Sequence, residues 1–299
     1  MTQTNRSSRA PGSEMSLSKH ERNTNTAIYI VLSVISAIWL LPFIFLVLQS
    51  FRSYLTENGG MVNYLIPKKF SLDNYQFLFS SECNFFTWYL NTLEIAAICA
   101  VLQTMIVLSV SYALSRMRFR GRRLIMNLIL VLGMFPGFLT MICLYFLLRT
   151  LGLTQQGAIP GLILVYVASS GMGYYISKGF FDTIPKSLDE SARIDGATRF
   201  QVFLSIIMPL SKPIVIYTAL MAFMAPWADY VYASYVAFGK PDSFNVAVGL
   251  FRWMVTKDYQ GYFTRFCAGG VLVSVPITAL FLVLQRYYVE GVTGGAVKG

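Results

Sequence analysis

DTIPKSLDESARIDGATRFQVFLSIIMPLSKP, residues 182–213, is a polar stretch between two apolar segments that are each long enough to cross a bilayer. Ser187 and Glu190 have the spacing of a capping box, in which each side chain accepts a backbone N–H, so a short helix is predicted to begin at Leu188. Gly196 is predicted to end this helix, because a residue without a Cβ adopts positive φ at no steric cost.

A second helix is predicted to start at Thr198, which forms another capping box with Gln201. It should end before Pro209, whose ring cannot continue a helical hydrogen-bond ladder. On the first helix, Leu188 and Ala192 share one face, while the charged side chains point elsewhere. Two interpretations of this amphipathic helix are open: it rests on lipid headgroups, or it docks against a cytoplasmic partner.

Composition places the chain among membrane proteins. Hydrophobic residues make up 55% of the sequence and charged residues 13%, and the mean hydropathy is +0.56, whereas soluble domains carry about 25% charged residues. The four cysteines have no metal-ligand or redox spacing, and the single histidine, His20, lies in the polar N-terminal tail. No histidine is therefore available in the membrane as a base or a metal ligand, which argues against a metal site and against most classes of enzyme.

Six apolar segments predict an all-α, polytopic membrane protein with six transmembrane helices. The segments are residues 27–50, 85–114, 124–148, 159–181, 214–238 and 266–288. They divide the chain into a flexible N-terminal tail (1–26), a first helix with an external loop (27–84), a core transmembrane domain that includes the loop 182–213 (85–288), and a glycine-rich C-terminal tail (289–299).

Lysine and arginine are distributed unevenly between the two sides of the membrane. Sixteen fall on the side that holds both termini, the arginine-rich turn at 116–123 and the loop at 182–213, and eight fall on the other side. The positive-inside rule therefore predicts that both termini and the loop are cytoplasmic, in a multi-pass protein of the bacterial cytoplasmic membrane. Topology thus accounts for the net charge of +10, and no binding of nucleic acid is expected.

Four of the spans contain a proline, which is expected to bend its helix because it frees a backbone carbonyl. These prolines are Pro42, Pro136, Pro226 and Pro276. Only Glu94 and Asp229 qualify as ionisable groups deep in the membrane, and Glu94 can also reach the interface from the start of its helix. The residues predicted to line a translocation path are Pro226, Trp227 and Asp229.

The loop resembles the EAA loop of ABC importer permeases, written E-A-A-x3-G-x9-I-x-L-P. The matching residues are Glu190-Ser191-Ala192, then Gly196 after three residues, then Ile206-Ile207-Met208-Pro209 after nine more. Ser191 replaces alanine and Met208 replaces leucine, and both keep size and polarity close to the family pattern. In that family the loop forms a coupling helix that fits into a cleft on the ATPase subunit. The resemblance therefore implies coupling to an ATPase by Glu190, Ser191, Ala192, Asp195, Gly196, Met208 and Pro209.

The resemblance extends over residues 85–299 to the carbohydrate class of these permeases, and most closely to the MalG type. It is carried by SYALSRMRF at 111–119, MFP at 134–136, the loop, and GGAVKG at 294–299. It implies the type I ABC importer permease fold and three partners: a MalF-like second permease, a homodimeric ATPase and an extracytoplasmic solute-binding protein. The implied cargo is an oligosaccharide of the maltose or maltodextrin kind, moved by alternating access.

Two further contacts are expected with these partners. The loop 239–265 carries aromatic side chains that suit an interface with the binding protein, and the candidate contacts are Trp253, Tyr259 and Tyr262. In MalG-type subunits a glycine-rich end inserts between the two ATPases, which implies the same position for Gly294, Gly295 and Lys298. No sugar ligands are assigned to this chain, because in the maltose system the partner permease makes those contacts.

The chain lacks the G-x4-G-K-[ST] pattern of a phosphate-binding loop, so it is not expected to bind ATP. It is therefore interpreted as a transport subunit and not an enzyme, with no cofactor of its own and with ATP and Mg on the partner subunits. The sequence leaves three alternatives: an ion-coupled secondary transporter, a polytopic membrane enzyme, and an ABC permease for another sugar or a polyol. An ion-coupled secondary transporter would need more ionisable groups in the membrane and an inverted repeat.

Overall fold

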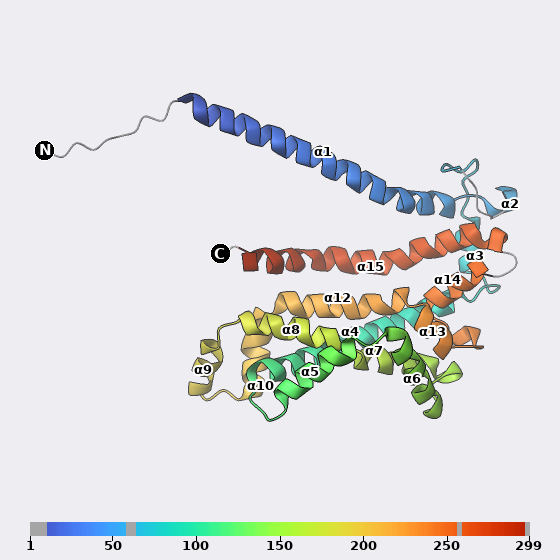
Figure 1. The fold of residues 1–299 in the computed structure, drawn as a ribbon. Helices are drawn as coiled ribbons and strands as arrows, with labels where there is room; N and C mark the ends of the chain where they lie inside the picture. The colour runs from blue at the N-terminus through green and yellow to red at the C-terminus, as the bar shows by residue number, and fades with distance from the viewer. Residues whose placement is uncertain (1–10, 58–63, 256–258, 297–299) are drawn as a thin grey trace.

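The computed structural model describes residues 11–57, 64–255 and 259–296 (Figure 1). Within these ranges the chain is helical and contains no β-strand, and two segments meet only in an isolated bridge between Arg52 and Phe70. The all-α fold expected from the apolar segments is therefore confirmed.

Helix α4 (Phe85–Arg116) is the centre of the bundle. It packs against α12 (Lys212–Ala228), α8 (Gly171–Thr183) and α7 (Ala158–Ala168). Residues such as Ile95, Ala96 and Cys99 on its inner faces are fully buried. The apolar residues that recur along α4 thus form one wall of the core.

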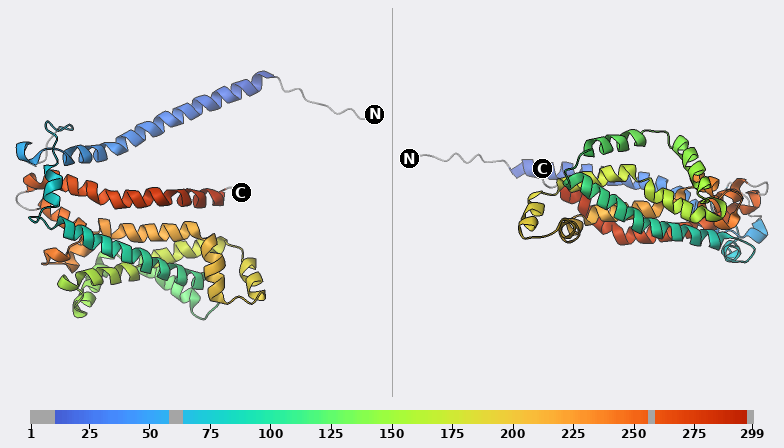
Figure 2. Two further views of the ribbon diagram at one scale, coloured as in Figure 1. Left: turned by 180° about the vertical axis from the view of Figure 1, so that it is seen from behind. Right: turned by 90° about the horizontal axis from the view of Figure 1, so that it is seen from below.

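Two long helices flank this bundle. Helix α1 (Pro11–Ser50) packs against α15 (Tyr259–Ala296), which in turn packs on α12 and on α14 (Val246–Val255). Figures 1 and 2 show α1 diverging from α15 toward its N-terminus, so most of α1 lies apart from the rest of the bundle. The side chains described from 23 to 44 are exposed, as expected of an apolar helix that faces lipid or another subunit.

Three of the six predicted spans are broken into two helices each. Residues 124–148 are divided between α5 (Arg122–Gly133) and α6 (Gly137–Thr150), residues 159–181 between α7 and α8, and residues 214–238 between α12 and α13 (Val231–Val236). Three helices of the described residues are long and apolar enough to cross a membrane, or up to five spans if each strongly bent pair counts as one. The predicted count of six spans is therefore not exact.

Two of the breaks have identifiable causes. Pro136 has an extended ψ of 119° at the start of α6, where it cannot continue the ladder of α5. Asp229 has a ψ of 99° after α12. The amide of Asn245 donates to the carbonyls of Pro226 (3.0 Å) and Asp229 (2.7 Å). This buried side chain thus satisfies carbonyls that the end of α12 leaves without helical partners.

Two predicted boundaries differ from the structure. Helix α1 begins at Pro11, inside the segment assigned to the N-terminal tail, and α15 continues to Ala296, inside the segment assigned to the C-terminal tail. A helix that is already nucleated by an apolar span gains one hydrogen bond for each residue it adds, so helical structure extends past the apolar pattern.

The two ends of the molecule carry different small elements. At one end lie α9 (Ser187–Ile194) and α10 (Arg199–Val202), with the start of α1 and the end of α15 (Figure 1). We call this the loop end. The opposite end carries α2 (Tyr54–Glu57) and α3 (Asp73–Leu78). There the buried amide of Asn74 donates to the carbonyls of Ser50 (2.9 Å) and Arg52 (2.8 Å), and accepts from Thr264 of α15 (2.9 Å). One side chain thus joins α1, α3 and α15.

Candidate functional site

The first helix of the loop, α9, starts one residue earlier than predicted. Its first turn is made by backbone bonds from Leu188 to Pro185 (3.3 Å) and from Glu190 to Lys186 (3.1 Å), so Lys186 is the N-cap and no side chain caps the helix. Ser187 therefore lies inside the helix, where its hydroxyl cannot act as a cap. The predicted capping box between Ser187 and Glu190 is wrong.

The end of α9 agrees with the sequence. Gly196 has a φ of +86°, and its N–H donates to the carbonyl of Arg193 (3.2 Å), while Ala197 N–H donates to the carbonyl of Ala192 (3.0 Å). These two bonds form a Schellman motif, which needs a left-handed residue at the glycine position. The prediction that Gly196 ends the helix in the left-handed conformation is confirmed.

The second helix is capped as predicted and then continues further than predicted. The capping box forms, since Gln201 N–H donates to Thr198 Oγ1 (3.3 Å) and Thr198 N–H donates to Gln201 Oε1 (2.8 Å). After α10 the chain forms a π-helical turn, Phe203–Ile207, and then α11 (Met208–Leu210). The prediction that the helix ends before Pro209 is wrong, because Pro209 lies in the first turn of α11, where the missing N–H of a proline is tolerated. The helical run 199–210 meets α12 at 85°.

The loop rests on the ends of α4 and α8 through a small apolar cluster. Ala192 of α9 is buried with Tyr112 of α4 and Phe181 of α8. Phe203 of the π-helical turn packs on Tyr112, with ring centroids 4.7 Å apart. Leu188, expected on the same face as Ala192, remains 40% exposed. The cluster fixes α9 on the bundle through one small residue, so most of the surface of α9 stays free.

One arginine ties the loop to two helices. Arg116 Nε, at the end of α4, lies 3.2 Å from Asp189 Oδ2, with side chains 4% and 15% exposed. Arg116 Nη2 donates to the carbonyls of Phe181 (2.9 Å) and Ile184 (2.7 Å), at the end of α8 and just after it. Burial raises the pKa of Asp189, and the attraction of Arg116 opposes that change only in part. Neither residue was singled out from the sequence, because this contact is between distant segments.

The outward side of α9 is exposed. Glu190, Ser191 and Asp195 are all exposed, and Ile194 is 86% exposed. The sequence pattern does not single out Ile194, which adds an exposed apolar side chain to the outward side of α9. Met208 and Pro209 lie in α11, at the base of the loop.

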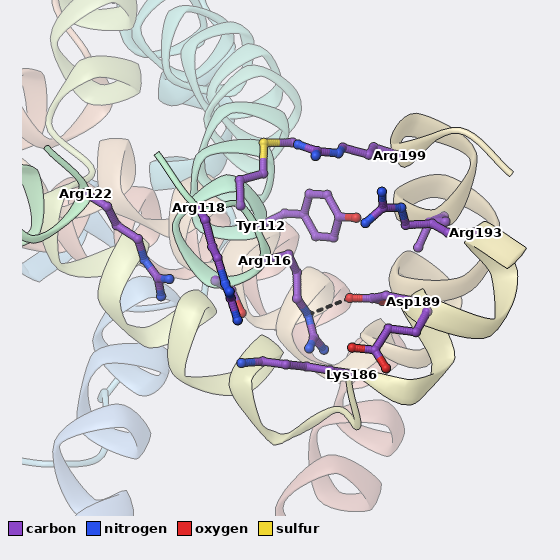
Figure 3. Close-up of a pocket in the computed structure, with 12 residues that line it drawn as sticks. Tyr112, Arg116, Arg118, Arg122, Lys186, Asp189, Arg193 and Arg199 are labelled. Atoms are coloured by element: carbon purple, nitrogen blue, oxygen red, sulfur yellow. Dashed lines mark ion pairs between the residues drawn. The ribbon is translucent and has the colours of Figure 1, made fainter. Parts of the chain in front are cut away.

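A basic cavity of about 440 Å³ lies between α9, α10, the end of α4 and the arginine turn that follows it (Figure 3). Figure 3 shows Arg116 facing Asp189, with Arg118 and Arg122 on one side and Arg193 and Arg199 on the other. Within the residues that the structure describes, no group of three or more His, Cys, Asp or Glu side chains comes together to hold a metal ion.

The residues predicted to line a path lie near the end of α12. Pro226 and Trp227 are buried within this chain, and Trp227 is 4% exposed. Asp229 is half-buried; its carboxylate accepts the hydroxyl of Tyr166 (2.5 Å) and the backbone N–H of Tyr232 (3.0 Å). Asp229 therefore stabilises the start of α13, and its place on a path stays a prediction. Glu94 is exposed on α4.

The residues predicted to meet a binding protein lie at the end opposite the loop. Trp253 is half-buried in an aromatic cluster, with its ring centroid 5.5 Å from that of Trp88 and 5.8 Å from that of Tyr262. The Tyr259 side chain lies outside the described residues. Gly294 and Gly295 lie in the last turns of α15, and Lys298 is also outside the described residues. These contacts stay predictions.

Bent apolar helices around a central span, with a structured polar loop at one end, describe a polytopic membrane protein. The family described as "Binding-protein-dependent transport system inner membrane component" matches residues 105–294. The chain belongs to this family, and its relatives are transport subunits and not enzymes.

Curated relatives match over nearly the whole chain. The chain is 35% identical over 275 residues to the galactooligosaccharides transport system permease protein GanQ of Bacillus subtilis, covering 91% of this chain and 94% of the relative. It is 34% identical over 287 residues to the maltodextrin transport system permease protein MalD of Streptococcus pneumoniae, covering 95% and 99%. A bacterial ABC transporter involved in the import of the acidic polysaccharide alginate has a chain of the same fold, with a TM-score of 0.74, 23% identity, and coverage of 90% and 98%.

Proposed function

We propose that this chain is a permease subunit of an ABC importer that moves a neutral oligosaccharide of the maltodextrin kind across the cytoplasmic membrane. The observation that carries the proposal is the geometry of α9. Its outward residues Glu190, Ser191 and Ile194 are accessible, while its inner side is fixed to the bundle through Ala192 and Asp189. A helix held in this way suits the coupling role of the EAA loop, in which an ATPase subunit grips the outward side.

The contacts of the loop supply a route from α9 into the membrane-spanning helices. A displacement of α9 acts on α4 through the Arg116–Asp189 pair and on the end of α8 through the two carbonyls that Arg116 holds. It also acts on α12 through the helical run that meets α12 at 85°. Packed elements transmit such movements because they do not deform continuously. Closure of an ATPase dimer on α9 would thus reorient α4, α8 and α12 together.

The oligosaccharide class rests on the relatives. Those that match over most of their length are named for maltodextrin, maltose and galactooligosaccharides. These cargoes are neutral and built from hexose units. Another sugar or a polyol is the alternative within the same family. An ion-coupled transporter is disfavoured, because membership in a binding-protein-dependent family favours a chain driven by a separate ATPase.

The partners follow from the same proposal. A MalF-like second permease would cover helix faces that this chain leaves exposed, including the side of α4 that carries Glu94. The loop end, with both termini, faces the cytoplasm and the ATPase subunits, which bind ATP and Mg. Gly294, Gly295 and Lys298 approach the ATPase dimer, and Trp253, Tyr259 and Tyr262 meet the solute-binding protein. Pro226, Trp227 and Asp229 lie next to the path.

The test uses the assembled importer, purified with its own second permease, ATPase and binding protein and reconstituted in vesicles. Labelled maltotriose, a galactooligosaccharide and sorbitol are offered separately, with ATP on the ATPase side. The proposal expects ATP-dependent accumulation of at least one of the two oligosaccharides and none of sorbitol. Uptake that persists without ATP and follows an ion gradient would contradict it, and uptake of sorbitol alone would support the polyol alternative.

A further inference from the structure

The cavity beside α9 carries an excess of positive charge. Its lining includes two carboxylates, those of Asp189 and Glu190, against six cationic side chains. The cations are Arg116, Arg118, Arg122, Lys186, Arg193 and Arg199. Among the described residues, Arg116 alone of these six forms an ion pair with a carboxylate. Because the cations outnumber the carboxylates around this one cavity, they repel one another, and a bound anion would relieve that repulsion.

A buried donor points to the same ligand chemistry. The side chain of Arg116 is 4% exposed, and it lines the cavity. Its Nη2 is satisfied by two carbonyls, but its Nη1 has no hydrogen-bond acceptor. A buried donor without an acceptor is unfavourable, and guanidinium groups match phosphate oxygens well. An anionic group that enters the cavity would supply the missing acceptor.

The surface around the cavity indicates where the anion comes from. Phe119 lies between Arg118 and Arg120 and is 42% exposed, and Leu124 and Ile125, which follow Arg123 in the first turn of α5, are 62% and 41% exposed. Helix α5 has no buried residue among those described. An apolar exposed surface that changes to arginines within a single turn marks the level of lipid headgroups. Basic pockets between helices at this level attract anionic headgroups.

From the cavity, its charge and its apolar rim, we infer that this site binds the phosphate of an anionic phospholipid headgroup next to the coupling helix. The acyl chains lie along the exposed apolar side of α5, and the phosphate accepts hydrogen bonds from Arg116, Arg118 and Arg122. Lys186 at the start of α9, Arg193 of α9 and Arg199 of α10 line the other side of the cavity. A lipid bound here touches α4 and α9 together, so the composition of the membrane bears directly on the position of the loop. This goes beyond the proposed transport function.

The experiment measures retained lipid on the intact importer. The complex is reconstituted in nanodiscs of phosphatidylcholine with a minor fraction of phosphatidylglycerol, released, and weighed by native mass spectrometry. The double variant Arg118→Gln/Arg122→Gln is compared with Arg120→Gln, which removes a charge of the same turn that does not line the cavity. Each neutralised cavity arginine is expected to weaken retention of phosphatidylglycerol about five-fold, while Arg120→Gln retains it like the wild type.

Three results would overturn the inference. Equal retention by the double variant and the wild type means that the cavity is not the site. Displacement of phosphatidylglycerol by inorganic phosphate at equal molar amounts assigns the cavity to a soluble anion and not to a lipid. Absence of phosphatidylglycerol from the wild-type complex means that another subunit fills the cavity. None of these readouts requires sugar transport, so failure here leaves the proposed function standing.

Discussion

The guanidinium of Arg116 and the carboxylate of Asp189, 3.2 Å apart and both largely buried, join the central helix α4 to α9. The two partners are not equivalent. Arg116 also holds the carbonyls of Phe181 and Ile184, whereas the Oδ1 atom of Asp189 has no hydrogen-bond partner. The contact therefore depends more on the arginine than on the aspartate.

Arg116→Gln should be more damaging than Asp189→Asn. Loss of the guanidinium leaves a buried carboxylate uncompensated and two carbonyls without a donor, which is expected to cost about 3 to 5 kcal/mol. Asp189→Asn also leaves a buried charge, that of Arg116, without its partner, but it keeps the two carbonyl contacts, so its cost should lie near the lower end of that range. Thermal unfolding of the purified importer, followed by fluorescence, compares the two. Equal losses would show that the pair is symmetric.

The stability of the loop should depend on pH through Asp189. Burial raises its pKa in the folded protein above the unfolded value of about 3.9. Folding therefore favours the protonated form of Asp189. The stabilisation that this protonation contributes is fully present below the unfolded pKa and is lost as pH rises through the folded pKa. The melting temperature of the wild type should rise relative to that of Asp189→Asn as pH falls toward this window. If the melting temperature of the wild type instead falls relative to that of Asp189→Asn on acidification, folding does not raise the pKa of Asp189.

Gly249 of α14 should tolerate no side chain. A Cβ at this position would lie 1.9 Å from Trp88 Cε3, and Trp88 is fixed by its hydrogen bond to the carbonyl of Pro241 (2.9 Å). Gly249→Ala is expected to lower stability by about 1 to 3 kcal/mol, the usual range for overpacking. The matched control is Gly179→Ala, where a Cβ meets nothing within 4 Å and a small gain is expected from helix propensity. Similar melting temperatures for the two variants would refute the close contact.

Gly196 should be needed for coupling and not for folding. Its φ of +86° costs an alanine about 1 kcal/mol, although a Cβ there meets no atom within 4 Å. Gly196→Ala is expected to insert and assemble, yet to lower the ATP hydrolysis that the binding protein stimulates, because the end of α9 shifts. Gly196→Asn is the control, since asparagine tolerates this conformation better. If Gly196→Ala keeps wild-type stimulation, the Schellman turn has no part in coupling.

Local signals were predicted well from the sequence, and contacts between distant segments were not. Gly196 and the Thr198–Gln201 pair act within a few residues, so their spacing is enough to identify them. Ser187 has an equally good spacing, but the backbone of Pro185 and Lys186 starts the helix before it. Whether Ser187 can cap the helix depends on the residue at which the helix begins, and the spacing of Ser187 and Glu190 does not determine that residue.

The breaks in the spans show a second limit. The apolar pattern continues through Ser169 and Asp229, so hydropathy alone predicts one unbroken helix through each of these positions. The second break is stabilised by Asn245, a side chain from a later segment, which bonds carbonyls of α12. Pro209 is the reverse case: a residue that normally ends a helix lies in the first turn of α11, directly after a π-helical turn, and the helical run continues. Each outcome depends on hydrogen bonds that only the folded chain reveals.

The central claim is that the outward side of α9 binds an ATPase subunit, and Ile194 tests it most directly. Ile194 is 86% exposed, so Ile194→Asp should not disturb the fold, while it places a charge in the middle of the proposed contact. Leu55→Asp is the control, because Leu55 is 79% exposed on α2 at the opposite end of the molecule (Figure 1). The measurement is the amount of ATPase subunit that co-purifies with the tagged permease. The account predicts a large loss for Ile194→Asp and none for Leu55→Asp; wild-type recovery of the ATPase with Ile194→Asp would contradict it.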